Sequence, residues 1–503
     1  MRTLTSTAAS GALPREGSPA SLLIRRAAML LVATLLSVGA YLSTDSPQIR
    51  EVIPLFSAAI VLQFVPLFFV KHPDPFTPAC IVAYPIGFGL LATMAYCMVN
   101  GSVEIGMLPH VSGQRKQELV EVVLWSYIVA TACYLAGYYA PLGVRFKTWF
   151  PKVTGLEWRR GRLAFACAVC LAAFIPAYAY FQSRVGTSFT DLTQQAAGKA
   201  VWREDPNQTW LARGVLLGMV PLLFWISAAL PRPRLRTALL VGGVTVCMML
   251  LVSRLGQRGL SFNFALSAII IIHYRYRRIP RWLVFCLIFA ALALGNILGA
   301  WRREGLDPHF EAGPVEAQAL RPAQVLAEHE SDRQRLAALA VLFHYFPDRK
   351  DYLMGESWAA ALVAPIPRWL WEDKVNYFRW RETTILWELV RVPTAVPIHG
   401  LFYANFSWIG MVLGMFGWGA VHRGLYEWLR ENKADRSVVL IYSTLGIYLA
   451  PSLLALSMVM QWVLPCYLIV RFIGRRPRLR AAASGSPAAA RLGALVVAHD
   501  RPR

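Results

Sequence analysis

Two arginines that stand four residues apart between two apolar runs are the residues of this chain best suited to chemistry. Arg254 and Arg258 belong to the segment SRLGQRG, where Gly256 and Gly259 permit a tight backbone. An arginine at membrane depth is costly and by default marks a functional site; the alternative is a snorkelling loop that contacts lipid headgroups. A guanidinium keeps its charge and binds two phosphate oxygens at once. The spacing therefore predicts a clamp for a phosphate-bearing group, with both arginines as catalytic residues.

Further polar residues stand at the borders of other apolar runs. Arg302 and Arg303 directly follow the run 282–301 and are expected either to complete the clamp or to act as interfacial anchors. His399 opens the run 398–420, and a histidine can take a proton from a hydroxyl group near neutral pH, so we assign it the role of catalytic base. The polar residues that we assign to substrate binding in the same region are Tyr403, Asn405 and Glu356. The alternative bases are the carboxylates Glu356, Glu372 and Asp373.

The composition indicates that these residues belong to a membrane protein. Hydrophobic residues make up 56% of the 503 residues and charged residues 16%, whereas a soluble protein has about 25% charged residues. Apolar runs of about 20 residues, the length needed to cross a bilayer as a helix, recur along the chain. We therefore predict an all-α polytopic membrane protein with about twelve transmembrane helices, at 27–42, 52–70, 77–98, 119–140, 162–182, 210–230, 237–252, 259–272, 282–301, 398–420, 437–450 and 452–471. The spacing Gly410-x-x-x-Gly414 is typical of helix packing.

The distribution of basic residues predicts how the helices are oriented. The loops and tails on the side of the N-terminus contain 30 Lys and Arg residues, and the short loops on the opposite side contain 8. By the positive-inside rule both termini lie in the cytoplasm, and the interval 302–397 lies on the outer side of the membrane. The same rule accounts for the net charge of +22, so no nucleic-acid partner is expected. All eight cysteines lie in apolar runs, which argues against disulfides and zinc.

The polar interval 302–397 separates two groups of predicted membrane helices. It is nearly neutral, with 12 Lys and Arg against 14 Asp and Glu, and a loop of this length usually has a function. We expect it to cover an active site at the outer face and to contain helices at 322–346 and 357–364, the second with Ser357 as its N-cap. The predicted parts of the chain are a cytoplasmic tail 1–26, transmembrane helices 27–301, the periplasmic loop domain 302–397, transmembrane helices 398–471 and a disordered basic cytoplasmic tail 472–503.

Three motifs together resemble a known family. They are SRLGQRG after an apolar run, the pattern G-x-S followed by IPRWLW-x-DK in the long interval, and G-x-x-Y-x-NF-x-x-x-G at the start of the run 398–420. In this order they resemble the O-antigen polymerases, the Wzy-type oligosaccharide repeat-unit polymerases of bacterial surface polysaccharides. The likeness covers about residues 180–420 by motif and most of the chain by topology.

The resemblance implies a glycosyltransferase of the inner membrane. Such enzymes transfer a glycan from one undecaprenyl-diphosphate carrier to a repeat unit on another, at the periplasmic face, without metal, nucleotide or other cofactor. The product is O-antigen lipopolysaccharide or exopolysaccharide, and the partners implied are the lipid-linked oligosaccharide, the lipid bilayer, a chain-length regulator and a flippase. Carried over by position, Arg254 and Arg258 hold the diphosphate with help from Arg303, while Arg368 and Lys374 steer anionic substrate.

Two positions depart from the family pattern, and two other functions compete with it. Leu401 stands where family members often carry an acidic residue, and Val375 stands where a proline is common; the first departure is why we select His399 as base. The rival functions are an O-antigen ligase, which moves finished glycan to lipid A core, and a lipid-linked oligosaccharide flippase or other transporter. The chain has no P-loop, dinucleotide, HExxH or Asp-x-Asp motif, which argues against a nucleotide-activated donor.

Overall fold

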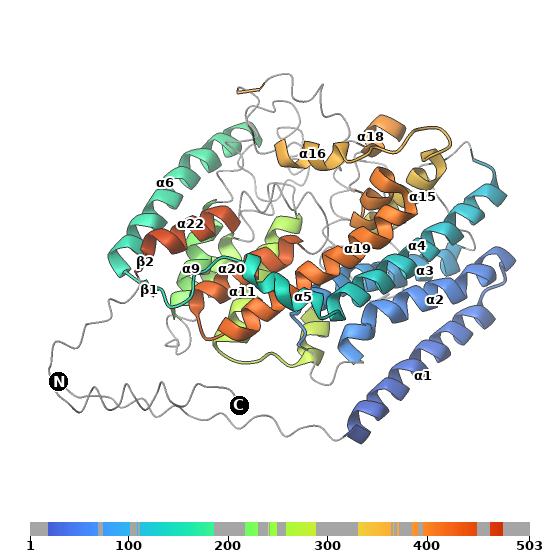
Figure 1. Cartoon of the computed structure of the whole chain (residues 1–503), viewed down its shortest axis with the longest axis horizontal. Coiled ribbons are helices and arrows are strands. Elements are labelled where there is room, and N and C mark those ends of the chain that lie inside the picture. Colours follow the sequence, from blue (N-terminus) through green and yellow to red (C-terminus); the bar gives the residue numbers. More distant parts are fainter. Residues whose placement is uncertain are drawn as a thin grey trace.

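The structure is a computed structural model in which helices dominate the part of the chain that it describes (Figure 1). The described residues also include a short antiparallel β pairing between β1 (Glu157–Trp158) and β2 (Gly474–Arg475). The described residues are 19–68, 74–100, 108, 111–185, 217–229, 240, 242–248, 258–287, 330–363, 366, 370–371, 385–390, 396–449 and 463–475.

Five helices among the described residues are long and apolar enough to cross a membrane. They are α2 (Pro47–Phe68), α3 (Pro78–Asn100), α4 (Gly113–Tyr139), α6 (Arg160–Val185) and α19 (Ile398–Asn432). The chain is therefore an all-α membrane protein, as its composition predicts. Each of the twelve predicted runs contains helix where its residues are described. The shorter helices and α1 have these bounds: α1 (Pro19–Ser43), α5 (Leu142–Arg145), the 3₁₀ helix η1 (Phe146–Trp149), α9 (Met219–Ala229), α11 (Arg258–Arg275), α15 (Glu330–Tyr345), α16 (Glu356–Val363), α18 (Ile385–Val390), α20 (Arg436–Leu449) and α22 (Leu464–Ile473). Residues 242–248 and 281–287 are also helical where they are described.

The contact between α4 and α19 lies at the centre of the fold (Figure 1). The two helices run in the same direction, because Tyr127 of α4 contacts His399 at the start of α19, and Gly137, ten residues later in α4, contacts Phe416, further along α19. A Cβ atom added to Gly137 would overlap the carbonyl oxygen of Phe416, and one added to Gly419 would overlap a carbonyl oxygen of α4. The backbones therefore touch, as small residues allow between membrane helices. The predicted topology also sends both helices through the membrane in one direction.

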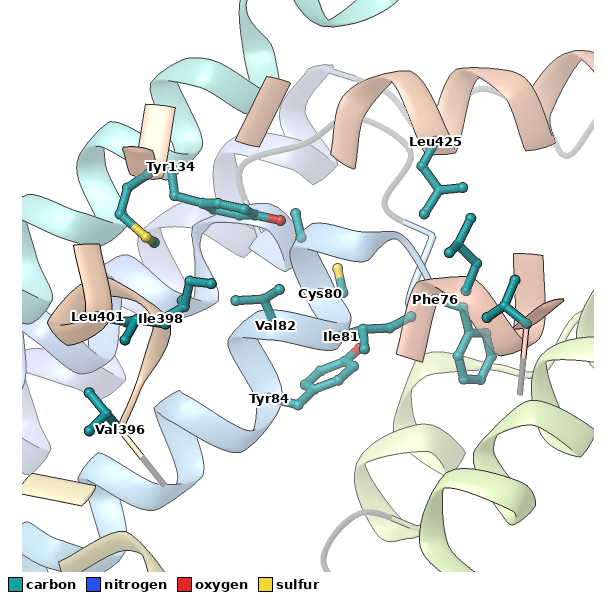
Figure 2. Packing of buried hydrophobic residues seen from close by; sticks show 14 of the residues in the cluster. Phe76, Cys80, Ile81, Val82, Tyr84, Tyr134, Val396, Ile398, Leu401 and Leu425 are labelled. Carbon is teal, nitrogen blue, oxygen red and sulfur yellow. The ribbon is translucent and has the colours of Figure 1, made fainter. Parts of the chain in front are cut away.

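Apolar side chains of α3 fill the space between α4 and the helices α11 and α20. Figure 2 shows Cys80, Ile81, Val82 and Tyr84 of α3 in this cluster, with Tyr134 of α4 on one side. These side chains are almost fully buried. The apolar run 77–98, which predicts a membrane helix, thus supplies side chains that contact neighbouring helices.

Asp74, just before α3, joins the ends of several helices. Its Oδ2 accepts hydrogen bonds from the hydroxyls of Tyr274 at 2.6 Å and Tyr426 at 3.3 Å. Its Oδ1 accepts from the backbone N–H of Phe76 at 3.0 Å and lies 3.7 Å from Nε2 of His273. One carboxylate thus links α3, α11 and the late part of α19.

Other polar contacts gather the predicted cytoplasmic segments at that same part of the bundle. Lys147 pairs with Glu431 at 2.6 Å, and the Trp158 indole donates to the Ser437 hydroxyl at 2.9 Å. Arg275 donates to the carbonyl oxygen of Ala434 at 2.6 Å. The helices α15, α16 and α18 lie at the top of Figure 1, around the opposite end of α19. The basic segments and the long polar interval are therefore at different ends of the bundle.

The backbone contact between α4 and α19 predicts an unequal effect of two substitutions on one helix. Gly419→Ala should destabilise the protein by about 1–3 kcal/mol, because overpacking forces the helices apart. Gly417→Ala should have little effect, because nothing lies within 4 Å of a Cβ atom at that position. Thermal unfolding of the two purified variants in detergent measures both changes. Equal midpoints would contradict the close contact.

Candidate functional site

The first turns of α19 carry three of the predicted site residues, and the helix breaks immediately after them. Phe406 (φ −142°, ψ 26°) and Ser407 (φ 64°, ψ −164°) are non-helical, so α19 consists of a short half, 398–405, and a long half, 408–432. A positive φ at a residue other than glycine stores strain of about 1–3 kcal/mol and persists only where neighbours enforce it. Contacts with neighbouring residues must therefore hold the break in this conformation.

The segment 353–355, from the predicted periplasmic interval, satisfies the carbonyl groups that the break leaves open. The backbone N–H of Leu353 donates to the carbonyl oxygen of Ala404 at 2.9 Å, and that of Met354 donates to the carbonyl oxygen of Asn405 at 3.1 Å. The N–H of Gly355 donates to Oδ1 of Asn405 at 3.0 Å. Inside an apolar layer, non-helical backbone is tolerated only where protein or water supplies such partners. The long interval thus completes the broken helix.

Asn405 is the centre of this arrangement. Its side chain is fully buried, and its Nδ2 donates to the Ser357 hydroxyl at 2.6 Å and to the carbonyl oxygen of Leu401 at 2.7 Å. Together with the bond from Gly355, these contacts give both the Oδ1 and the Nδ2 atom of the Asn405 amide hydrogen-bond partners within the protein. The predicted role of Asn405 in substrate binding stays a prediction. In this structure its side chain joins the first turn of α16 to α19.

The beginning of α16 differs from the sequence prediction. Ser357 was predicted as the N-cap, and this is wrong, because the helix starts at Glu356 and the Ser357 hydroxyl bonds Asn405 instead. The residue before the helix is Gly355, at φ +93°, a conformation that glycine adopts without strain. Glu356 is half-buried in the first turn, where a negative charge is favoured by the helix dipole.

Tyr403 fastens the end of α15 to the short half of α19. It is 3% exposed, and its hydroxyl donates to the carbonyl oxygen of Phe346 at 2.9 Å. Its ring lies 4.3 Å from that of Phe343 and 5.8 Å from that of Tyr352, measured between centroids. The hydroxyl that the sequence assigned to substrate therefore bonds the protein backbone in this structure.

His399 is buried against α4. It is 2% exposed, its ring centroid lies 4.6 Å from that of Tyr127, and its Nε2 has no hydrogen-bond partner among the described residues. Gly400, beside it, lies against Leu339 of α15. A base must meet a hydroxyl group at hydrogen-bond distance, and no described contact provides one, so the base role stays a prediction.

A second histidine stands at this end of the bundle and was not singled out from the sequence. His344 is half-buried in the last turn of α15. Burial, the largest cause, together with the charges of Arg349 and Arg115, lowers the pKa of its imidazole below the ordinary value. His344 is therefore neutral at neutral pH and able to accept a proton. No motif marks this histidine in the sequence.

The predicted phosphate clamp falls mostly outside the described residues. Arg254, Arg302, Arg303, Arg368 and Lys374 lie there, and of Arg258 the backbone alone is described. Arg258 is the first residue of α11, and the last turn of this helix carries His273 beside Asp74. At 1.5 Å per residue, the helix spans about 26 Å between its ends. The backbone of Arg258 is therefore at the end of α11 remote from Asp74.

The glycines Gly410 and Gly414 serve packing, but within α19 itself. A Cβ atom at Gly410 would overlap the side chain of Phe406, and one at Gly414 would overlap the ring of Phe402. The two phenylalanines of the short half thus fold onto the glycines of the long half. The G-x-x-x-G spacing allows the break rather than a contact with another helix.

Comparison with known proteins assigns no family. No protein-family model, no curated protein and no solved structure matches the chain. No group of three His, Cys, Asp or Glu side chains that could hold a metal ion is found among the residues that the structure describes. The class that the fold defines is an all-α membrane protein whose long polar interval is bonded to a broken helix.

The role of Asn405 predicts a local loss of order on substitution. Asn405→Ala leaves the Gly355 N–H and the Ser357 hydroxyl without a partner, which costs about 1–3 kcal/mol for a buried group. Hydrogen exchange of the backbone amides at 353–358 should become faster. Asn432→Ala is the matched control, because Asn432 also donates to the carbonyl four residues earlier, Trp428, but at the far end of α19. Unchanged protection at 353–358 in Asn405→Ala would contradict the role.

Proposed function

We propose that this chain polymerises undecaprenyl-diphosphate-linked oligosaccharide repeat units into a surface polysaccharide, O-antigen or exopolysaccharide. It acts as a metal-independent glycosyltransferase of the bacterial inner membrane. It has twelve transmembrane helices and cytoplasmic termini, and its active site is at the periplasmic face under the interval 302–397. The support from sequence is the set of three motifs. The support from structure is the attachment of this interval to the break in α19.

The attachment is the observation that carries the proposal. A long polar interval that merely linked two helices would need no backbone bonds to a helix inside the bundle. Here Leu353 and Met354 donate to Ala404 and Asn405, which belong to the same short half of α19 as the predicted base His399. Broken membrane helices accommodate polar ligands in other membrane proteins, because they bring backbone groups and water to a defined depth. An enzyme that acts on a headgroup at one face needs such a site.

The predicted chemistry uses a fixed positive charge. The bond between the anomeric carbon of the donor glycan and its diphosphate breaks, and a bond from that carbon to a hydroxyl oxygen of the acceptor forms. The hydroxyl proton passes to the base, His399 in our assignment, and the lipid diphosphate leaves. Arg254 and Arg258 neutralise the charge that develops on the leaving group. Arg258 also begins α11, and the N-terminus of a helix favours an anion.

The clamp predicts a sharp effect of one substitution. Arg258→Ala should lower polymer synthesis by about 100- to 1,000-fold, the usual effect of removing one group that stabilises a developing negative charge. Arg277→Ala is the control, because Arg277 is exposed beyond the opposite end of the same helix. Each variant is expressed in cells that lack the gene, and the surface glycan is separated by electrophoresis. Normal chain lengths with Arg258→Ala, at normal protein level, would remove the central assignment.

Two assays separate the proposed polymerase from its rivals. Purified protein in vesicles should make a ladder of products from lipid-linked repeat units alone. A ligase needs the lipid A core as acceptor and would make no ladder. A flippase or other transporter would move the lipid-linked glycan across the vesicle membrane without lengthening it. Loss of the gene should leave a single repeat in place of the ladder, and an unchanged ladder would contradict the proposal.

A further inference from the structure

An open apolar groove lies between α1 and α2, on elements separate from the candidate site. Its volume is about 480 Å³. One wall consists of residues of α1 between Leu30 and Leu42, and the other consists of residues of α2 between Ile53 and Val61. The last turn of α1 is fixed by a small buried cluster that includes Ala40. The buried cluster thus holds the two walls of the groove together at this end, and the groove is open on the outer side of the helix pair.

A single cation stands at one end of the groove. Arg50 is the fourth residue of α2, close to the point where α1 passes into α2, and its guanidinium lies 5.7 Å from the ring centroid of Tyr41, which lines the groove. Its Nε donates to the carbonyl oxygen of Thr44 at 2.9 Å. Within the described ranges no carboxylate forms an ion pair with Arg50. The terminal nitrogens can therefore receive an anion from outside the protein.

The length of the groove indicates what kind of molecule fits. The wall on α1, from Leu30 to Leu42, is about 18 Å long at 1.5 Å per residue, and the wall on α2, from Ile53 to Val61, is about 12 Å long. The hydrocarbon core of a bilayer is about 30 Å thick, so one leaflet contributes about 15 Å. The groove is thus one leaflet deep, from the level of Arg50 to the middle of the membrane. A transmembrane helix of a partner would need about twice that length, whereas a fatty acyl chain matches it.

We propose that this groove binds one anionic glycerophospholipid, with an acyl chain between α1 and α2 and its phosphate on Arg50. Apolar walls and a terminal cation are complementary to the two parts of such a lipid. Attraction of an anionic headgroup to one arginine is worth about 1 kcal/mol near a membrane surface, which corresponds to about fivefold in affinity. The site does not depend on the glycosyltransferase proposal, because it shares no residue with the predicted active site.

Native mass spectrometry of the full chain tests the lipid site. The detergent-purified protein is titrated with phosphatidylglycerol or with the zwitterionic phosphatidylcholine of the same acyl chains. We expect one tightly bound phosphatidylglycerol, about fivefold stronger binding than that of phosphatidylcholine, and loss of this preference in Arg50→Ala. Ala58→Trp and Thr34→Trp place a bulky ring in the groove from opposite walls, at positions that are exposed in the structure. Each should abolish the tight site for both lipids.

Leu35→Trp is the matched control, because Leu35 is 61% exposed on α1 and does not line the groove. It should bind phosphatidylglycerol as the natural chain does. Retention of the tight site in both groove-filling variants would overturn the proposal, as would equal binding of the two lipids with no effect of Arg50→Ala. A dimer that is lost in Ala58→Trp while lipid binding persists would identify a second copy of the chain as the occupant and overturn it as well.

Discussion

A helix that stops inside an apolar layer leaves carbonyl groups that water cannot reach, and this constraint governs the candidate site. In α19 the break at Phe406 and Ser407 exposes the carbonyls of Ala404 and Asn405, and the segment 353–355 provides their donors. Because the partners come from the long polar interval, that interval is bound to the bundle at a defined point. The predicted base and the two predicted substrate ligands on α19 all lie within the eight residues that precede the break. Their positions therefore depend on this contact.

The second constraint is charge. Side chains and backbone groups of the predicted cytoplasmic segments bond one another around Asp74, Glu431 and Asp435, far from the interval that completes α19. A basic loop is costly to move across a bilayer, and a polar cover is useful only beside the site that it covers. The unequal distribution of basic residues thus distinguishes the two ends of the bundle. In our proposal the reaction takes place at one end, and the basic segments anchor the protein at the other.

The five long apolar helices could be predicted from the sequence, because a run of about 20 apolar residues matches the thickness of a bilayer. The helices predicted at 322–346 and 357–364 are also present in the described residues, as α15, which ends at Tyr345, and α16. The break in α19 could not be predicted, since the segment NFSW has no proline or glycine and its conformation is enforced by partners about 50 residues away. For the same reason the prediction of Ser357 as a cap is wrong, and the sequence did not show that Tyr403 and Asn405, the predicted substrate ligands, bond Phe346 and Ser357. The geometry of the arginine clamp lies outside the described residues and stays a prediction.

The parallel contact of α4 with α19 has a consequence for the order of events during synthesis. Their facing surfaces are separated by more than 250 residues of chain between Tyr139 and Ile398. At about 5–20 residues per second, α4 is complete on the order of tens of seconds before α19 leaves the ribosome. During that time the surface around Gly137 has lipid, or the insertion machinery, as its neighbour. The surface at Gly137, which later contacts the backbone of α19, must therefore first be stable in contact with lipid or with the insertion machinery.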